Sequence, residues 1–135
     1  QILTTQPAPV TLVASLSGSA EVPGPGDADA FGAAEFRVDV RKAKVCFTLV
    51  VLDLTLPTAA AHIHEGTEGV AGDIVVTLEA PVEIAGSGIG LSSGCVGDQS
   101  KALLRNIKNN PDQFYCNVHT SDFPAGAVRG QLSVA

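Results

Sequence analysis

The stretch EFRVDVRKAKVCFTLVVL, residues 35–52, alternates apolar and polar side chains in two runs joined by a lysine-rich turn. Apolar residues fill every second position from Phe36 to Val40 and again from Val45 to Val51. A period of two is the pattern of a β-strand with one buried face, so we predict a β-hairpin here. The other face of the second run is also largely apolar, which predicts a central strand covered on both faces. The residues on that face are Cys46, Thr48, Val50 and Leu52.

Five further segments have strand patterns, and turn-forming residues separate them. Glycine (14) and proline (8) are frequent, which favours many turns over long helices. We expect the glycine- and serine-rich segment 85–94 to be a flexible connection. The predicted strands lie within residues 10–22, 58–65, 73–84, 113–120 and 126–134.

One helix is expected, near residues 99–109, where three apolar residues have helical spacing. Asp98 or Ser100 can cap its start, and Pro111 ends it. Seven or so short strands and a single helix predict an all-β protein, an antiparallel Greek-key β-sandwich or barrel.

Composition narrows the classes of partner. Apolar residues make up 45% of the 135 residues and charged residues 16%, so we expect one folded domain over residues 1–135. A net charge of −6 argues against a nucleic-acid partner, which would favour a basic stripe. Since no run of 18 apolar residues occurs, no membrane span is expected.

The chain starts at Gln1 and contains no methionine, which we interpret as a mature, secreted, extracellular protein after removal of a signal peptide. Three cysteines, Cys46, Cys95 and Cys116, fit an oxidising compartment as one disulfide and one remaining thiol. Their spacing leaves all three pairings open.

The segment AAAHIHEGTEG, residues 59–69, contains two of the three histidines. His62 and His64 point to the same face of a strand, and His119 lies 55 positions after His64. If their strands lie close together, three imidazoles can bind one transition-metal ion. The alternative is that each ring separately bonds a loop or a carboxylate. A structural zinc site with four ligands is disfavoured, because the cysteines lack close metal-binding spacing.

Other polar residues offer weaker hypotheses. Glu65 and Asp122 lie near the histidines in sequence and could hold their ring N–H groups, or they are solvated loop carboxylates. Arg129 lies on an apolar strand, where it could pair with a carboxylate or attract an anion towards a metal. No nucleophile elbow occurs, so nucleophilic hydrolysis has little support.

Three blocks of the chain resemble the CHRD (chordin-type) domain family: LSGSAEVPG, TAAAHIHEGTEGVAGDIVVTL and NPDQFYCNVHTSDFPAGAVRGQL. The resemblance covers about residues 11–133 as a single CHRD domain and implies an extracellular protein. In chordin such domains occur as repeats that accompany growth-factor binding. Family members often have cysteines at the positions of Cys46 and Cys95, which implies that these two form the disulfide and Cys116 stays free.

The order His-x-His-Glu, a glycine-rich loop, a later Val-His and then an arginine is similar to copper–zinc superoxide dismutase. The similarity places His62, His64 and His119 on three copper ligands and Arg129 near the anion-guiding arginine. The fourth histidine and the remaining zinc ligands of that enzyme are missing, so the similarity implies a copper-only site.

We therefore expect a secreted copper-binding protein in which His62, His64 and His119 are the metal ligands, with zinc as the alternative ion. The second hypothesis is a copper-only, superoxide dismutase-like oxidoreductase in which Arg129 is catalytic. The third is a non-catalytic module that binds an extracellular protein or a second copy of itself. Whether the protein is an enzyme stays open at this point.

Overall fold

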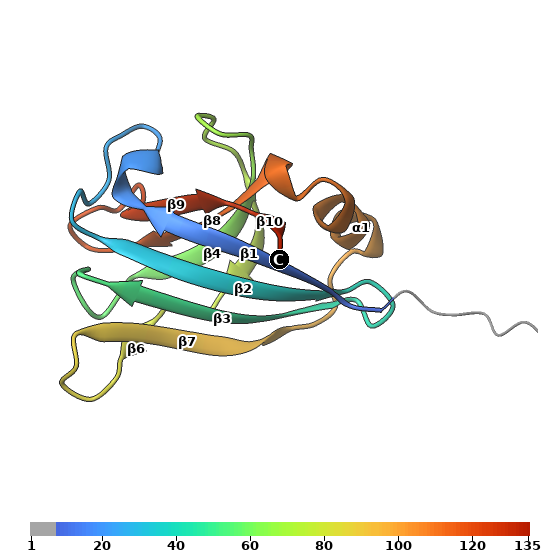
Figure 1. Cartoon of the computed structure of the whole chain (residues 1–135), viewed down its shortest axis with the longest axis horizontal. Helices are drawn as coiled ribbons and strands as arrows, with labels where there is room; N and C mark the ends of the chain where they lie inside the picture. The colour runs from blue at the N-terminus through green and yellow to red at the C-terminus, as the bar shows by residue number, and fades with distance from the viewer. Residues whose placement is uncertain (1–7) are drawn as a thin grey trace, which may run out of the picture.

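The structure, a computed structural model, describes residues 8–135 and contains ten strands and one α-helix (Figure 1). All strand pairs are antiparallel, which confirms the predicted all-β fold with one short helix. In the described residues no helix is long and apolar enough to cross a membrane. The strands are β1 (Val10–Ser17), β2 (Phe31–Asp39), β3 (Lys44–Leu52), β4 (Ala60–Glu65), β5 (Ile74–Leu78), β6 (Val82–Glu83), β7 (Ile89–Val96), β8 (Phe114–His119), β9 (Val128–Gln131) and β10 (Ser133–Val134).

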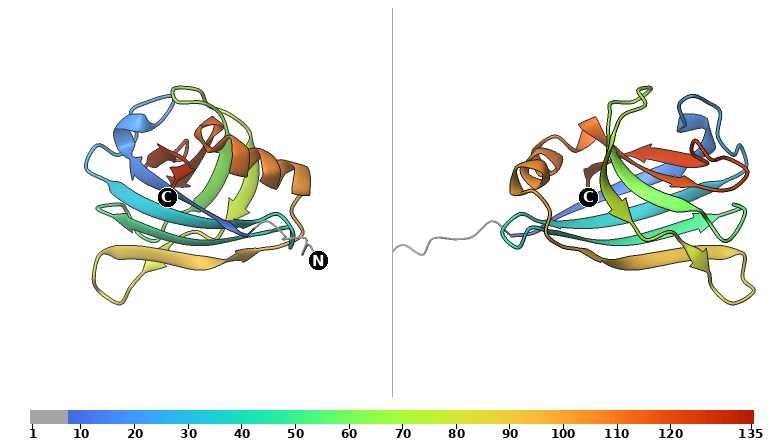
Figure 2. Two further views of the ribbon diagram at one scale, coloured as in Figure 1. Left: turned by 45° about the vertical axis from the view of Figure 1, so that its right-hand side comes forward. Right: turned by 180° about the vertical axis from the view of Figure 1, so that it is seen from behind.

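The strands form one continuous sheet in the order β5-β4-β8-β9-β1-β2-β3-β7-β6, and β10 pairs with β1. Figure 2 shows that this sheet curls round on itself into an open half-barrel. The chain crosses between the two sides of the sheet after β3, after β5 and after β7, as in Greek-key folds. Because of these crossings β4, β8 and β9 become neighbours, although β4 lies about fifty residues before β8 in sequence.

The core fills the inside of the curl, and the alternation seen in the sequence determines which side chains enter it. In β2 and β3 every second residue from Gly32 to Val38 and from Val45 to Val51 is buried. Phe36, Val45 and Leu49 are all 0% exposed. Burying side chains of this size is the main contribution to the stability of such a fold.

The helix α1 (Lys101–Asn109) closes one end of the half-barrel (Figure 1). Ser100 caps it, since its hydroxyl accepts a hydrogen bond from the Leu103 N–H at 3.1 Å. Leu104 and Ile107 are buried against the core. The predicted helix and its cap are therefore confirmed.

Three details differ from the sequence-based expectations. Segment 85–94 is not a flexible connection: it enters β7, which pairs with β3 along its whole length. Small residues fit this position, because a Cβ at Gly90 would lie 2.7 Å from a Val51 methyl group. Residues 73–84 form two strands, β5 and β6, at opposite edges of the sheet, with Pro81 between them. β3 is central but covered on one face only, since Thr48 is exposed and Val50 is half-buried.

The disulfide joins Cys46 on β3 to Cys95 on β7, two residues that face each other directly in the sheet. This is the pairing that the CHRD resemblance implies. Cys116 is a buried free cysteine. Burial raises the pKa of its thiol to about 12, so the group stays protonated and behaves as a small apolar side chain.

Candidate metal centre

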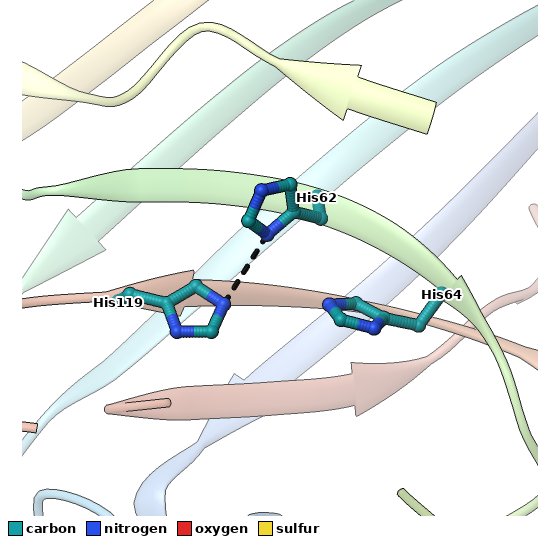
Figure 3. Close-up of side chains that lie close together, drawn as sticks. All are labelled: His62, His64 and His119. Carbon is teal, nitrogen blue, oxygen red and sulfur yellow. Dashed lines mark hydrogen bonds between the residues drawn. The ribbon is translucent and has the colours of Figure 1, made fainter. Parts of the chain in front are cut away.

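The three histidines meet on the outer face of the sheet, where β4 and β8 are neighbours (Figure 3). His62 and His64 point the same way, while Ile63 between them is 0% exposed and enters the core. His119, at the end of β8, faces the start of β4, where it pairs with Ala60. A β-bulge in the pairing of β4 with β5 lies between Ile63 and His64. One ring nitrogen from each histidine lies within 4.8 Å of the other two.

Backbone carbonyls determine which nitrogen of two rings carries the proton. His64 Nδ1 lies 2.9 Å from the Gly72 carbonyl oxygen, and His119 Nδ1 lies 2.9 Å from that of Pro124. A carbonyl can only accept, so each Nδ1 is the donor, and each ring in its neutral form has its lone pair at Nε2. A lone pair at Nε2 of His64 requires a donor from Asn117, so the NH2 group of the Asn117 amide faces this nitrogen when the ring is neutral. The Nε2 atom of His119 lies 3.2 Å from Nδ1 of His62. Because Nε2 of His119 accepts, Nδ1 of His62 carries a proton in the metal-free protein. An ion held by Nδ1 of His62 and Nε2 of His64 and His119 would displace that proton.

The rings of His62 and His64 are neutral at neutral pH. Burial lowers the pKa of both, and the neighbouring imidazoles lower that of His62 further. The hydrogen bonds that His64 makes to Gly72 and to Asn117 act in the opposite direction but are outweighed. A neutral imidazole is the form that binds a metal.

His64 is buried, at 8% exposure, because Tyr115 and the glycine-rich segment 66–72, which we call the covering loop, lie over it. The Tyr115 ring stacks parallel to the His64 ring, with 4.8 Å between the centroids. The Tyr115 hydroxyl accepts a hydrogen bond from the Gly72 N–H at 3.0 Å. The end of the loop passes so close to the end of β4 that residue 72 must be glycine, since a Cβ there would lie 1.6 Å from the Glu65 carbonyl oxygen. The loop thus holds the acceptor of His64 in place.

Arg129 on β9 holds the same loop in place through hydrogen bonds. It is 1% exposed, and its guanidinium donates to the carbonyls of Val70 at 2.7 Å and Thr67 at 2.8 Å. Its Cζ also lies 3.4 Å from the centre of the Tyr115 ring, in a cation–π contact. Since β8 lies between β4 and β9, Tyr115 is held between Arg129 and His64. The guanidinium is therefore engaged with backbone and ring.

The sequence model of the CHRD domain matches residues 12–132. The chain belongs to the CHRD-domain family. The match runs from β1 to the residue after β9 and includes all three histidines. A search of curated proteins finds no match to the chain. The similarity to copper–zinc superoxide dismutase rests on the histidine pattern and stays a prediction.

The structure of this CHRD domain assigns other partners to the rings than the sequence predicted. Asp122 accepts a hydrogen bond from the Thr55 hydroxyl at 2.5 Å, and Glu65 is exposed. The prediction that one of these carboxylates holds a ring N–H of His64 or His119 is wrong, because backbone carbonyls do so. An anion-guiding role for Arg129 stays a prediction.

Sequence reasoning missed the residues that support the site. Asn117 lies between the rings, and its side-chain amide lies 2.9 Å from Nε2 of His64. Gln131 donates from Nε2 to the Gly66 carbonyl at 3.0 Å and so fixes the start of the covering loop. The period-two pattern of β8 places Tyr115 and Asn117 on the same face as His119, and this pattern could have identified both as neighbours of the histidines.

Arg129→Lys is expected to loosen the covering loop in this CHRD domain. A lysine ammonium lacks the planar fork that reaches two carbonyls and stacks on a ring. We expect amide hydrogen exchange at Val70 and Gly72 to become about tenfold faster in the metal-free protein. Arg105→Lys, on the exposed side of α1, is the control and should leave both amides unchanged. Unchanged exchange rates in Arg129→Lys would contradict the role of Arg129 in holding the covering loop.

Glu21, in the LSGSAEVPG block, is buried like Arg129, and the two are the only buried acidic or basic side chains besides His64 among residues 8–135. Its Oε2 atom is buried and has no hydrogen-bond partner. Burial raises the pKa of Glu21 from 4.5 to about 7, although the charge of Arg129 and the Val22 N–H oppose the rise. Residue 126 has φ +136° and a Cβ there would lie 2.3 Å from Oε2, so only glycine fits against the carboxylate.

The free energy of unfolding should therefore decrease as the pH rises from about 4.5 to about 7. In this range the unfolded chain has already released the Glu21 proton, while the folded chain still holds it. Glu21→Gln removes this cost. We expect it to raise the free energy of unfolding at pH 8 by about 1 to 2 kcal/mol, allowing for solvent screening, and to change it little at pH 4. Urea unfolding at both pH values measures this, with exposed Glu79→Gln as control. An equal effect at both pH values would contradict the assignment.

Proposed function

We propose that this CHRD-domain protein binds one transition-metal ion, copper in preference to zinc, through His62, His64 and His119, and does so outside the cell. The observation that supports this most is the convergence of three imidazole nitrogens within 4.8 Å of one another. These three residues are all the histidines in the chain.

The donor set fits such an ion. Two of the rings are oriented by backbone carbonyls at Nδ1, the outer-sphere arrangement typical of metal-binding histidines. Nitrogens about 2 Å from one ion lie roughly 3.3 to 3.5 Å apart, so the His62–His119 pair at 3.2 Å already has this separation. The largest separation, 4.8 Å, exceeds this value by about 1.5 Å, so His64 needs to approach the other two rings by that amount at most. An ion would then replace its contact with Asn117.

The chemistry of the donors favours copper. Imidazole binds both zinc and copper, and for a given nitrogen site the affinity for Cu²⁺ exceeds that for Zn²⁺. When bound, copper would supply a centre able to change oxidation state. The protein's own residues orient the rings, keep the Nδ1 protons of His64 and His119 in place, and shield His64 from water with Tyr115 and the covering loop.

The charges around the site favour uptake of a cation. Exposed Glu65, Glu68 and Asp73 belong to or border the covering loop, and exposed Asp122 follows His119 closely. Arg129, by contrast, is buried and donates to loop carbonyls. A negative local field raises the local concentration of cations and lowers that of anions. We therefore favour metal binding over superoxide dismutation as the function of the site.

A copper-only oxidoreductase of the superoxide dismutase type is the second candidate. One observation favours it: His62 and His119 are only partly buried, so an ion between them would face solvent. A superoxide assay on copper-loaded protein decides this. Turnover no faster than that of chelated copper would exclude the enzyme and leave the binding function.

The binding function is tested by titrating the metal-free protein with Cu(I), Cu(II) and Zn(II) against chromophoric competitors. We expect saturation at about one ion per chain and displacement of zinc by copper. Uptake that does not saturate would contradict the proposal. Stronger retention of zinc than of copper would contradict the choice of metal.

A further inference from the structure

The cations of this acidic protein are gathered at one end of the molecule. Segments 35–44 and 98–112 contain seven of its eight lysines and arginines and four carboxylates, a net charge of +3. The rest of the chain has one cation, Arg129, and ten carboxylates, a net charge of −9. Together these give the overall −6. The seven cations are Arg37, Arg41, Lys42, Lys44, Lys101, Arg105 and Lys108.

The two segments are neighbours in space and form what we call the basic end. Figures 1 and 2 show the β2–β3 turn and α1 at the same end of the half-barrel. The Gln99 N–H donates to the Ala43 carbonyl at 2.9 Å and ties the start of the helix to the turn. Five of the seven cations are exposed; Lys44 and Lys108 are half-buried. Strand, turn and helix thus present their charges to solvent together.

Part of the basic end is hollowed. A surface hollow of about 250 Å³ is lined by three cations and one carboxylate, with Pro9 and Cys46 completing its wall. The carboxylate, Asp39, accepts a hydrogen bond from the Lys42 backbone N–H at 3.0 Å. The three cations outnumber it, so the hollow favours an anion. They are Arg37, Lys42 and Lys44.

We infer that the basic end binds a polyanionic polysaccharide, whose repeated sulfate or carboxylate groups contact Arg37, Lys42 and Lys44 in the hollow and the cations of α1 beside it. This binding is separate from the metal site. Exposed cations spaced over three elements suit a chain of repeated charges. Arginine can form two parallel hydrogen bonds to a sulfate or carboxylate group.

Other polyanions fit less well. Within residues 8–135, the exposed large apolar residues all lie outside the two segments, so the basic end lacks side chains that would insert into a membrane or form the apolar centre of a protein interface. The two segments contain one aromatic residue, Phe36, and it is 0% exposed, so neither segment offers a ring that could stack on unpaired bases. The exposed apolar residues are Phe31, Val70, Ile74, Val82, Ile84 and Val134.

The test measures binding of the intact protein to heparin, to polygalacturonate, to a short DNA duplex and to phosphatidylserine vesicles. We expect binding to at least one polysaccharide that weakens as salt is raised. A preference for heparin would identify sulfate as the recognised group, and a preference for polygalacturonate would identify carboxylate. Equal or tighter binding to the duplex or to vesicles would overturn the choice of partner, and failure to bind either polysaccharide at low salt would overturn the site.

Variants locate the surface. Arg37→Gln/Lys42→Gln should weaken polysaccharide binding roughly tenfold, and so should Lys101→Gln/Arg105→Gln. Ala28→Glu/Ala85→Glu changes the net charge equally at exposed positions elsewhere and should have a much smaller effect. Equal losses in all three double variants would mean that only net charge matters and would overturn the proposal. His64→Ala should bind the polysaccharide as the unaltered protein does, which keeps this test independent of the metal site.

Discussion

His64→Ala is expected to lower the affinity of the protein for copper by about a hundredfold or more. The substitution removes one of three ligands, and altering even the partners of a ligand typically costs ten- to a hundredfold. His64 is also the most enclosed of the three rings, held by the Gly72 carbonyl and stacked on Tyr115. Competition with a chromophoric Cu(I) chelator measures the loss.

Glu65→Ala is the matched control for this substitution. Residue 65 is the next one in β4, its side chain is exposed, and strand alternation turns it away from His64. It removes a negative charge near the site, so a small loss of affinity is expected from the weaker field. A loss as large as that of His64→Ala would mean that charge, and not coordination, determines copper uptake. Unchanged affinity in His64→Ala would remove His64 from the site.

Replacing both Cys46 and Cys95 by serine is expected to lower the free energy of unfolding by about 4 kcal/mol. The disulfide joins residues 49 positions apart. Closing a loop of this length lowers the conformational entropy of the unfolded chain, which raises its free energy by about 4 kcal/mol. Total stabilities of domains of this size are only about 5 to 15 kcal/mol, so the variant should be far less stable. Urea unfolding of the oxidised protein and of the double variant measures the difference.

Cys116→Val is the control for that experiment. Cys116 is buried and unpaired, and valine has a similar size and no polar group to bury. We expect its effect to stay below about 1.5 kcal/mol. If the double variant loses no more free energy of unfolding than this control, the disulfide contributes little to stability, which would contradict the prediction.

Side-chain alternation made much of the fold predictable. It located most strands and placed His62 and His64 together on one face of theirs. The helix was predictable because its apolar spacing, its Ser100 cap and the following Pro111 agree. These features depend on neighbours within a few residues of one another.

Features that depend on distant segments were not predictable in this way. β7 is rich in glycine and serine and reads as a loop, yet β3 offers it a complete set of backbone partners. The histidine partners are carbonyls of Gly72 and Pro124, and every residue type has a carbonyl, so no sequence pattern identifies them. Arg129 reads as a lone cation, because Val70 and Thr67, its acceptors, lie about sixty residues earlier.

The most direct test of the metal site is anomalous diffraction from crystals of the protein grown with one equivalent of copper. A single strong peak between Nδ1 of His62 and the Nε2 atoms of His64 and His119, about 2 Å from each, is the expected result. A peak at the carboxylates of the covering loop, or none near the three rings, would contradict coordination by the histidines.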